Sequence, residues 1–114
     1  MRKLTKTFQA LSDTNRIRIL KMLEVRPLCV CEITEILKLA NSTVSKHLSI
    51  LRDAEFILDE KDGKWVNYFL NDTKENLYIT KLLPLISTWI PENEVISDDR
   101  KKVKTVDRNI ICSV

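Results

Sequence analysis

The stretch that decides the fold is residues 41–52, which read Asn-Ser-Thr-Val-Ser-Lys-His-Leu-Ser-Ile-Leu-Arg. Val44, Leu48 and Leu51 recur in it at positions i, i+4 and i+7, and this spacing predicts a helix with one buried stripe. Such a helix leaves an outer face that is short, polar and partly basic. Side chains of this kind suit a DNA major groove, where hydroxyls and amides read base edges and a lysine meets phosphate. On one helix alone, an ordinary solvent-facing surface is the simpler interpretation, so the neighbouring segments decide.

The segment before this stretch predicts a second, shorter helix. Apolar residues at helical spacing indicate that it runs from about Val30 to near Leu39. A short connection at residues 40–41 follows, and Ser42 is a suitable cap for the next helix. Two helices joined by a tight turn, the second with a polar outer face, are typical of a helix-turn-helix.

The segment after the stretch predicts a β-hairpin. Residues 56–59 and 65–70 are rich in aromatic and β-branched side chains, and the single glycine of the chain lies between them. We expect the turn at residues 62–63, which read Asp-Gly. A hairpin after a helix-turn-helix is a wing, and Lys61 and Lys64 at its tip are placed to contact the sugar-phosphate backbone.

Three further helices are predicted around this unit. The first covers residues 2–11, the second follows it directly, and the last covers about residues 74–90, where Pro84 should kink or split it. Phe8 and Trp89 belong to apolar faces that so small a core cannot bury, so we expect a symmetric dimer. The predicted fold class is mainly α with a β-hairpin wing, a winged helix-turn-helix whose first and last helices form a homodimer interface.

Length and composition limit the possible classes of protein. The chain has 114 residues, enough for one domain, and its net charge of +3 permits nucleic-acid binding without requiring it. No apolar run could cross a bilayer and the N-terminus lacks the apolar core of a signal peptide, so we expect a cytoplasmic protein with no membrane partner. We assign residues 1–90 to the winged, dimerising domain. Residues 91–114 are mostly charged and weakly periodic, and we expect a polar, partly mobile tail.

Four segments carry a family resemblance: residues 8–20 (Phe-Gln-Ala-Leu-Ser-Asp-Thr-Asn-Arg-Ile-Arg-Ile-Leu), 28–33 (Leu-Cys-Val-Cys-Glu-Ile), 42–48 (Ser-Thr-Val-Ser-Lys-His-Leu), and 62–64 together with Tyr68. Taken together, they resemble the ArsR/SmtB family of bacterial metal-sensing repressors. The resemblance implies a homodimeric repressor that binds an inverted-repeat operator and releases it when an inducer binds. The chain departs from the family at Glu55, where a glycine usually follows the recognition helix. It also lacks the last-helix ligands of the zinc-sensing branch, since His47 is its only histidine.

Cys29 and Cys31 are the strongest candidates for ligand chemistry. They stand at the start of a predicted helix, where unpaired backbone amides and the helix dipole lower the pKa of a thiol. Two thiolates two residues apart can bind one soft ion if the first turn departs from regular helical geometry. The alternative is that both are small buried apolar residues, because free cysteine packs well. The family context favours the ligand interpretation.

The resemblance also indicates which ion is bound. The arsenic-sensing branch carries Cys-Val-Cys at this place, usually with a third cysteine three residues later, where this chain has Thr34. As(III) and Sb(III) favour three thiolates, and Cys112 is the remaining cysteine. It either completes the site, from the same subunit or across the dimer, or is a stray terminal residue. We therefore expect As(III) or Sb(III) as inducer, with Cys29, Cys31 and Cys112 as ligands and no cofactor needed for DNA binding.

The expected DNA contacts come from the second helix of the helix-turn-helix and from the wing. They are Asn41, Ser42, Thr43, Ser45 and Lys46 in the groove, with Arg52, Lys61 and Lys64 on phosphates. His47 is assigned to the DNA interface as a structural or phosphate-contacting residue. Trp65, Tyr68 and Trp89 are interpreted as core or interface aromatics, because no basic patch interleaves with them.

Three alternatives remain. The same scaffold could sense a soft divalent ion such as lead or cadmium, or oxidation or persulfidation of its thiols. It could also bind DNA without any effector. A thiol oxidoreductase would need a Cys-x-x-Cys motif in a βαβ setting, which is missing, so we do not expect an enzyme.

Overall fold

The computed structural model describes residues 1–90 and 93–111. In these ranges the chain forms α1 (Arg2–Ala10), α2 (Thr14–Leu23), β1 (Leu28–Cys29), α3 (Val30–Leu37), α4 (Asn41–Asp53), β2 (Ile57–Asp62), β3 (Trp65–Leu70), α5 (Leu77–Trp89), α6 (Glu94–Thr105) and α7 (Arg108–Ile111). The fold is mostly helical with one small antiparallel sheet, and the prediction of a winged helix-turn-helix is confirmed. None of the helices in the described ranges has the length and apolar composition that crossing a bilayer needs.

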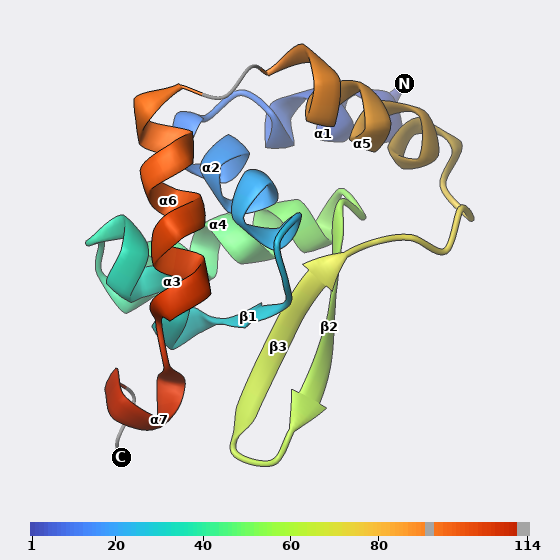
Figure 1. The fold of residues 1–114 in the computed structure, drawn as a ribbon. Coiled ribbons are helices and arrows are strands. Elements are labelled where there is room, and N and C mark those ends of the chain that lie inside the picture. The colour runs from blue at the N-terminus through green and yellow to red at the C-terminus, as the bar shows by residue number, and fades with distance from the viewer. Residues whose placement is uncertain (91–92, 112–114) are drawn as a thin grey trace.

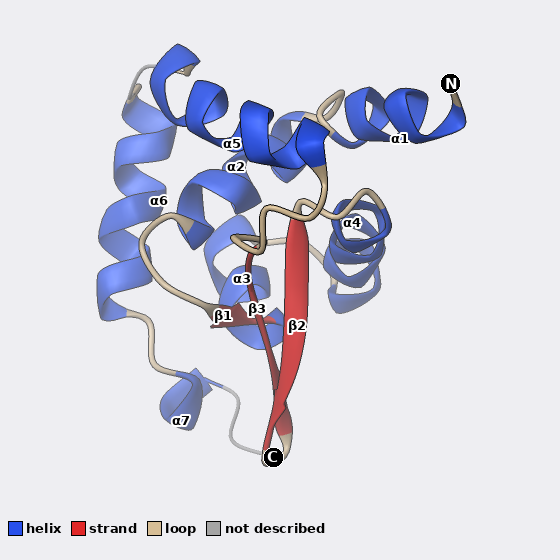
Figure 2. Cartoon of the chain, turned by 90° about the vertical axis from the view of Figure 1, so that its right-hand side faces the viewer, coloured by secondary structure: helices blue, strands red, loops and turns tan. Residues whose placement is uncertain are grey.

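The wing is the hairpin of β2 and β3, which projects away from the helices (Figures 1 and 2). The sheet order is β1-β3-β2, so β3 is the central strand. Asp62 pairs with Trp65, which places the two-residue turn at residues 63–64. Gly63 has φ +61°, a conformation that glycine adopts without steric cost. The turn therefore lies one residue later than the sequence predicts.

The turn of the helix-turn-helix covers residues 38–40. Lys38 ends α3 in the left-handed conformation (φ 59°), and α4 begins at Asn41. The capping position of α4 is held by Ala40, which has no side-chain oxygen to offer. The prediction that Ser42 is the cap is wrong, because Ser42 already lies in the first turn of α4 and keeps its hydroxyl on the outer face.

The end of α4 depends on Glu55, which has φ +68° where a glycine is usual. The Phe56 amide donates to the Leu51 carbonyl (3.0 Å) and the Glu55 amide to the Arg52 carbonyl (2.9 Å). These two bonds form the Schellman motif that ends many helices. The side chain of Asn71 donates to the Glu55 carbonyl, and that of Asn76 to the Glu55 carboxylate, each at 2.9 Å. Contacts with the segment before α5 thus hold a non-glycine residue in this conformation.

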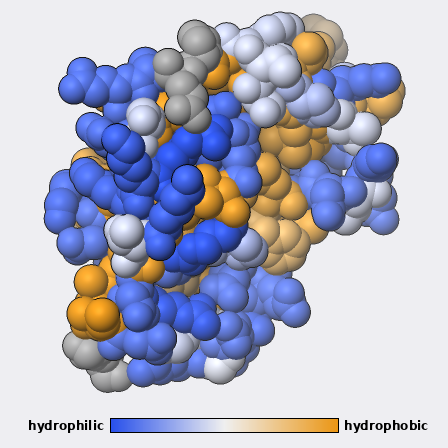
Figure 3. Space-filling model, viewed as in Figure 1, coloured by the Kyte–Doolittle hydropathy of each residue, from blue (hydrophilic) through white to orange (hydrophobic). Residues whose placement is uncertain are grey.

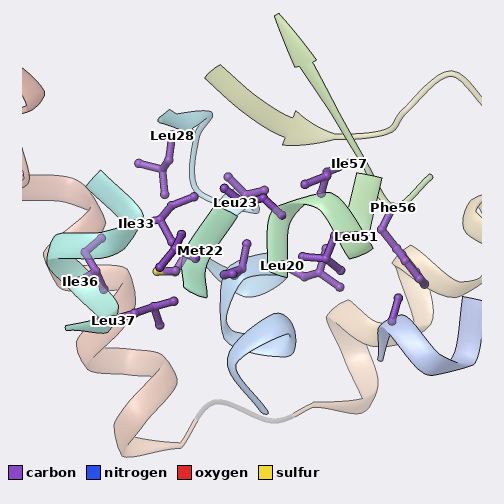
Figure 4. Close-up of a cluster of buried hydrophobic side chains, with 14 of the residues drawn as sticks. Leu20, Met22, Leu23, Leu28, Ile33, Ile36, Leu37, Leu51, Phe56 and Ile57 are labelled. Carbon is purple, nitrogen blue, oxygen red and sulfur yellow. The ribbon is translucent and has the colours of Figure 1, made fainter. Parts of the chain in front are cut away.

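The core is a single apolar cluster between the helices (Figure 4). Val44, Leu48 and Leu51 are fully buried, as their spacing predicts. Phe56 and Ile57, at the start of the wing, are fully buried as well. The same cluster therefore fixes both the orientation of α4 and the base of the wing.

The C-terminal segment is more regular than the sequence predicts. Residues 94–105 form α6, which packs against α2 and α3 (Figure 1). Asp99 of α6 is buried and accepts two hydrogen bonds from the Arg18 guanidinium, at 2.8 and 2.9 Å. Val103, also buried, joins the core. The expectation of a partly mobile polar tail is therefore wrong for α6, because a paired carboxylate takes a core-facing position.

Candidate effector site and nucleic-acid interface

The outer face of α4 is open to solvent. The expected groove contacts that are exposed are Asn41, Ser42, Thr43, Ser45 and Lys46. A shallow hollow beside them is lined by Arg16, Ser42, Thr43, Lys46, His47 and Ile50. The Asn41 side-chain oxygen also accepts a hydrogen bond from the Thr34 hydroxyl (2.9 Å), so Asn41 joins the two helices of the motif.

His47 lies at one side of this hollow and contacts Arg16 of α2. The Arg16 guanidinium is 3.1 Å from His47 Nδ1 and also donates to the carbonyls of Ala10 (2.8 Å) and Gln9 (3.1 Å) at the end of α1. A guanidinium can only donate, so Nδ1 must accept and the ring carries its proton on Nε2. Arg16, which is itself held by the end of α1, therefore fixes the orientation of the His47 ring.

The expected phosphate contacts lie at the two ends of the wing. Lys61 is exposed near the tip, and Lys64 in the turn has its ammonium 4.7 Å from the centroid of the Trp65 ring. Arg52, at the end of α4, forms an exposed ion pair with Asp59 of β2 (3.0 Å). This pair links the recognition helix to the base of the hairpin.

The effector candidates lie where β1 passes into α3. Cys29 has extended backbone angles (φ −91°, ψ 167°) and occupies the capping position, while Cys31 lies in the first turn of α3 and is half-buried. Cys29 thus lies just outside the regular helix, as an N-cap residue usually does, while Cys31 lies within it. Cys29 itself is free and only 2% exposed.

The pKa of the Cys29 thiol shifts in the opposite direction from the prediction. Burial raises its pKa above the ordinary value, and the nearby Glu32 carboxylate raises it further. Hydrogen bonds from the backbone amides of Glu32 and Cys31 act in the opposite direction but do not prevail. The prediction that the helix start lowers the pKa of this thiol is therefore wrong for Cys29, because removal from water outweighs the backbone amides.

Glu32 and Arg26 connect this site to α6. One Glu32 oxygen accepts a hydrogen bond from the Cys29 amide (3.0 Å), and the other accepts from Arg26 (3.1 Å). Arg26 also donates to the carbonyls of Val103 and Val106, each at 3.1 Å, at the end of α6. Unpaired carbonyls and the negative end of a helix dipole favour a cation there. The first turn of α3 and the last turn of α6 are therefore held by one guanidinium.

Comparison with known proteins identifies the family. The model described as "Bacterial regulatory protein, arsR family" matches residues 13–58. The arsenical resistance operon repressor of Escherichia coli K12 is 32% identical over 106 residues, which cover 90% of this chain and 80% of that protein. The chain belongs to the ArsR family. A protein of the same description from Bacillus subtilis 168 is 43% identical over 77 residues, covering 67% of this chain and 73% of the relative.

Solved structures agree with this assignment. Reduced HlyU from Vibrio cholerae matches the ArsR-family chain with a TM-score of 0.65 and 26% identity, over 80% of this chain and 92% of HlyU. The ArsR family transcriptional regulator RHA00566 matches with a TM-score of 0.60 and 26% identity, covering 81% of this chain and 95% of its own. This ArsR-family protein is thus a DNA-binding transcriptional repressor and not an enzyme.

The sequence pattern did not predict two polar residues beside the candidate cysteines of this ArsR-family protein, Glu32 and Arg26. Glu32 could have been found, because Cys29-x-x-Glu32 has the spacing of a capping box with sulfur in place of the usual hydroxyl. Arg26 leaves no such signal, since its partners at the end of α6 are distant in sequence. No group of three His, Cys, Asp or Glu residues that could hold a metal occurs within 1–90 and 93–111. Cys112 lies outside the described residues.

Proposed function

We propose that this ArsR-family repressor acts as a homodimer that releases its operator when As(III) or Sb(III) binds Cys29 and Cys31, with Cys112 as third ligand. The observation that carries the proposal is the position of Cys29 and Cys31 at the start of α3, the first helix of the helix-turn-helix, which leads directly into α4. The names of two relatives, both arsenical resistance operon repressors, support arsenic as the inducer. Each thiol that binds As(OH)₃ displaces one hydroxide, which leaves as water with the thiol proton.

Burial of Cys29 suits a switch better than a simple binding site. An ion at this thiol must draw the strand-to-helix junction toward itself, because the side chain is enclosed. The Cys29 amide is bonded to Glu32, so a shift of Cys29 alters the first turn of α3. To release DNA, the ion must bind the free repressor more tightly than the operator-bound one, by about 1–3 kcal/mol in typical switches.

In the proposed complex, α4 enters the major groove and the wing lies on the backbone. The groove contacts are Asn41, Ser42, Thr43, Ser45, Lys46 and His47, and the phosphate contacts are Arg52, Lys61 and Lys64. The two recognition helices of a dimer would read an inverted repeat with half-sites about one helical turn apart.

The proposed dimer interface is the apolar surface of α1 and α5. Phe8 is 54% exposed, Leu77 66% and Trp89 63%, which is unusual for large apolar side chains on neighbouring helices. Leu83 of α5 and Leu70 at the end of β3 line a further apolar hollow. Figure 3 shows that apolar side chains gather on this face of the molecule between the α5 region and the wing. A second copy related by twofold symmetry would cover such a surface.

The decisive experiment is an operator-release titration. Purified repressor on fluorescent operator DNA is titrated with arsenite, antimonite, cadmium, lead and zinc, for the wild type and for Cys29→Ser, Cys31→Ser and Cys112→Ser. We expect arsenite to release the wild type, and Cys29→Ser to bind the operator with wild-type affinity but to lose the response. Unchanged release from Cys29→Ser would contradict the proposal.

A second candidate is the same repressor with a soft divalent ion or a thiol modification as its signal. The cadmium resistance transcriptional regulatory protein CadC homolog of Staphylococcus aureus is 38% identical over 68 residues, covering 59% of this chain and 56% of that protein. Release by cadmium or lead but not by arsenite would favour this candidate. Release after oxidant or persulfide treatment, with the matching mass increase, would favour thiol modification.

A further inference from the structure

The side chain of Arg108 attaches the short helix α7 to the wing. The guanidinium donates to the Asn67 side-chain oxygen (2.8 Å) and to the Asp62 carboxylate (2.7 Å). It also lies over the Trp65 ring, 4.2 Å from the centroid. Asp62 belongs to β2 and the other two residues to β3, so Arg108 holds both strands of the hairpin at once.

The residues that Arg108 holds are close to the effector candidates. Asn67 stands directly opposite Cys29 in the pairing of β1 with β3. Arg26, Glu32, Asn67 and Arg108 line one polar hollow of about 300 Å³. A displacement at Cys29 therefore reaches the anchor of Arg108 through a single strand pair.

The segment that carries Arg108 is also held against the sensing end of α3. α7 packs against α3, and Figure 1 shows it below that helix, at the side of the hairpin. Arg26 bonds the carbonyls at the end of α6 and the Glu32 carboxylate at the start of α3. The C-terminal segment thus has one attachment at the effector end and another on the wing.

We propose that Arg108 is a positioning residue, which orients the wing for operator binding and carries the displacement at Cys29 and Cys31 to the wing when an effector binds. The second half of this statement rests on the proposed function; the first half does not. A two-stranded hairpin that projects from a domain is weakly stable by itself, so a side chain that holds both strands decides how the tip is oriented.

Charge supports the same assignment. Asp62 stands between the two lysines expected to meet phosphate, where an unpaired carboxylate would repel the DNA backbone. The Arg108 hydrogen bond and charge lower the pKa of this carboxyl, so Asp62 stays ionised and its charge is offset by the guanidinium. Loss of Arg108 would both loosen the wing and leave a negative charge at its tip.

The test compares Arg108→Ala and Arg108→Lys with Lys104→Ala. Lys104→Ala is a matched control, because it removes one positive charge from an exposed position on α6. Operator affinity, the arsenite concentration for half-release and direct arsenite affinity by thiolate absorbance are measured for each. The wing is followed by Trp65 emission in a Trp89→Phe background, after sedimentation has checked its oligomeric state.

We expect Arg108→Ala to weaken operator binding by about tenfold more than the control, and to reduce the factor by which arsenite weakens operator binding by about fivefold, at unchanged arsenite affinity. Arg108→Lys keeps the charge without the two-pronged contact and should recover part of the affinity. Arsenite should change Trp65 emission in the parent but not in Arg108→Ala.

Two outcomes would overturn the proposal in different ways. If Arg108→Ala matches Lys104→Ala in operator affinity and leaves Trp65 emission unaltered, Arg108 does not position the wing. If Arg108→Ala is released by arsenite as fully as the wild type, the signal does not pass through Arg108. If neither arsenite nor any other thiol-directed ion released the wild type, the proposed function would be wrong, and with it the proposal that Arg108 carries the displacement to the wing. The proposal that Arg108 orients the wing would still be tested by operator affinity.

Discussion

The start of α3 and the outer face of α4 belong to the same helix-turn-helix, yet the polar groups are buried and hydrogen-bonded in the first and exposed to solvent in the second. At the start of α3, Cys29 and Glu32 are buried, and Glu32 is bonded to the Cys29 amide and to Arg26. On α4, Ser45 and Lys46 are exposed to solvent. A surface that binds DNA has to remain exposed to solvent. A site whose occupancy changes the conformation of the protein has to be bonded to the elements around it. The difference predicts that mutations at the start of α3 alter stability and mutations on α4 alter operator binding.

The largest effect is expected from Glu32→Ala. The change leaves the Cys29 amide without its acceptor and Arg26 without its carboxylate, which should lower the free energy of unfolding by about 1–3 kcal/mol. Urea denaturation followed by circular dichroism measures it. Glu35→Ala on the same helix is the control, because its ion pair with Lys38 is exposed and is worth only about 0–0.5 kcal/mol. If both changes lowered the free energy of unfolding equally, the buried contacts at the start of α3 would be no more stabilising than an exposed ion pair, and the contrast would fail.

Lys46→Ala should weaken DNA binding and leave folding stability nearly unchanged, which is the reverse of the effect expected for Glu32→Ala. Stability should change by less than about 0.5 kcal/mol, since the side chain is exposed. Operator and unrelated DNA should both bind more weakly, and the slope of log affinity against log salt should fall by about one. Fluorescence anisotropy at several salt concentrations measures this slope. Lys101→Ala serves as control, because α6 lies on the side of the molecule away from α4 (Figure 2), and a slope reduced equally by both changes would contradict the assignment.

The smallest effect is a pH dependence at Cys29. Folding raises the pKa of this thiol, so the native state favours the protonated form more than the unfolded chain does. The resulting stability is fully present below the unfolded pKa of about 8.5 and is lost as pH rises through the higher native value. Denaturation of the wild type and Cys29→Ala between pH 7 and 10 should show their difference narrowing at high pH. A constant difference would mean that burial does not govern the thiol.

Much of the helix-turn-helix and wing follows from local sequence. Val44, Leu48 and Leu51 are buried as their spacing predicts, and the glycine lies in the hairpin turn. The exact turn position escapes prediction, because Asp-Gly and Gly-Lys are both acceptable central pairs and the strand register decides between them.

Contacts between distant segments could not be predicted from the sequence. An aspartate in a charged segment is typical of a surface, and Asp99 is buried only because Arg18, 81 residues away, pairs with it, so the sequence hides the buried face of α6. Arg108 lies 46 residues from Asp62, and no local pattern links them. At the candidate effector site, the two cysteines stand out in the sequence, but the raised pKa of Cys29 does not, because the burial of this thiol depends on how α3, β3 and α6 pack.

The contact between Arg16 and His47 has a consequence for the choice of base in the operator. With Nδ1 occupied by the guanidinium, the imidazole can offer a hydrogen from Nε2 but has no lone pair left for a partner. In the proposed complex it would select acceptors, such as the N7 and O6 atoms of guanine or a phosphate oxygen, and reject the amino group of cytosine. Arg16 of α2, whose side chain is mostly buried, would thereby restrict which base of the operator His47 accepts.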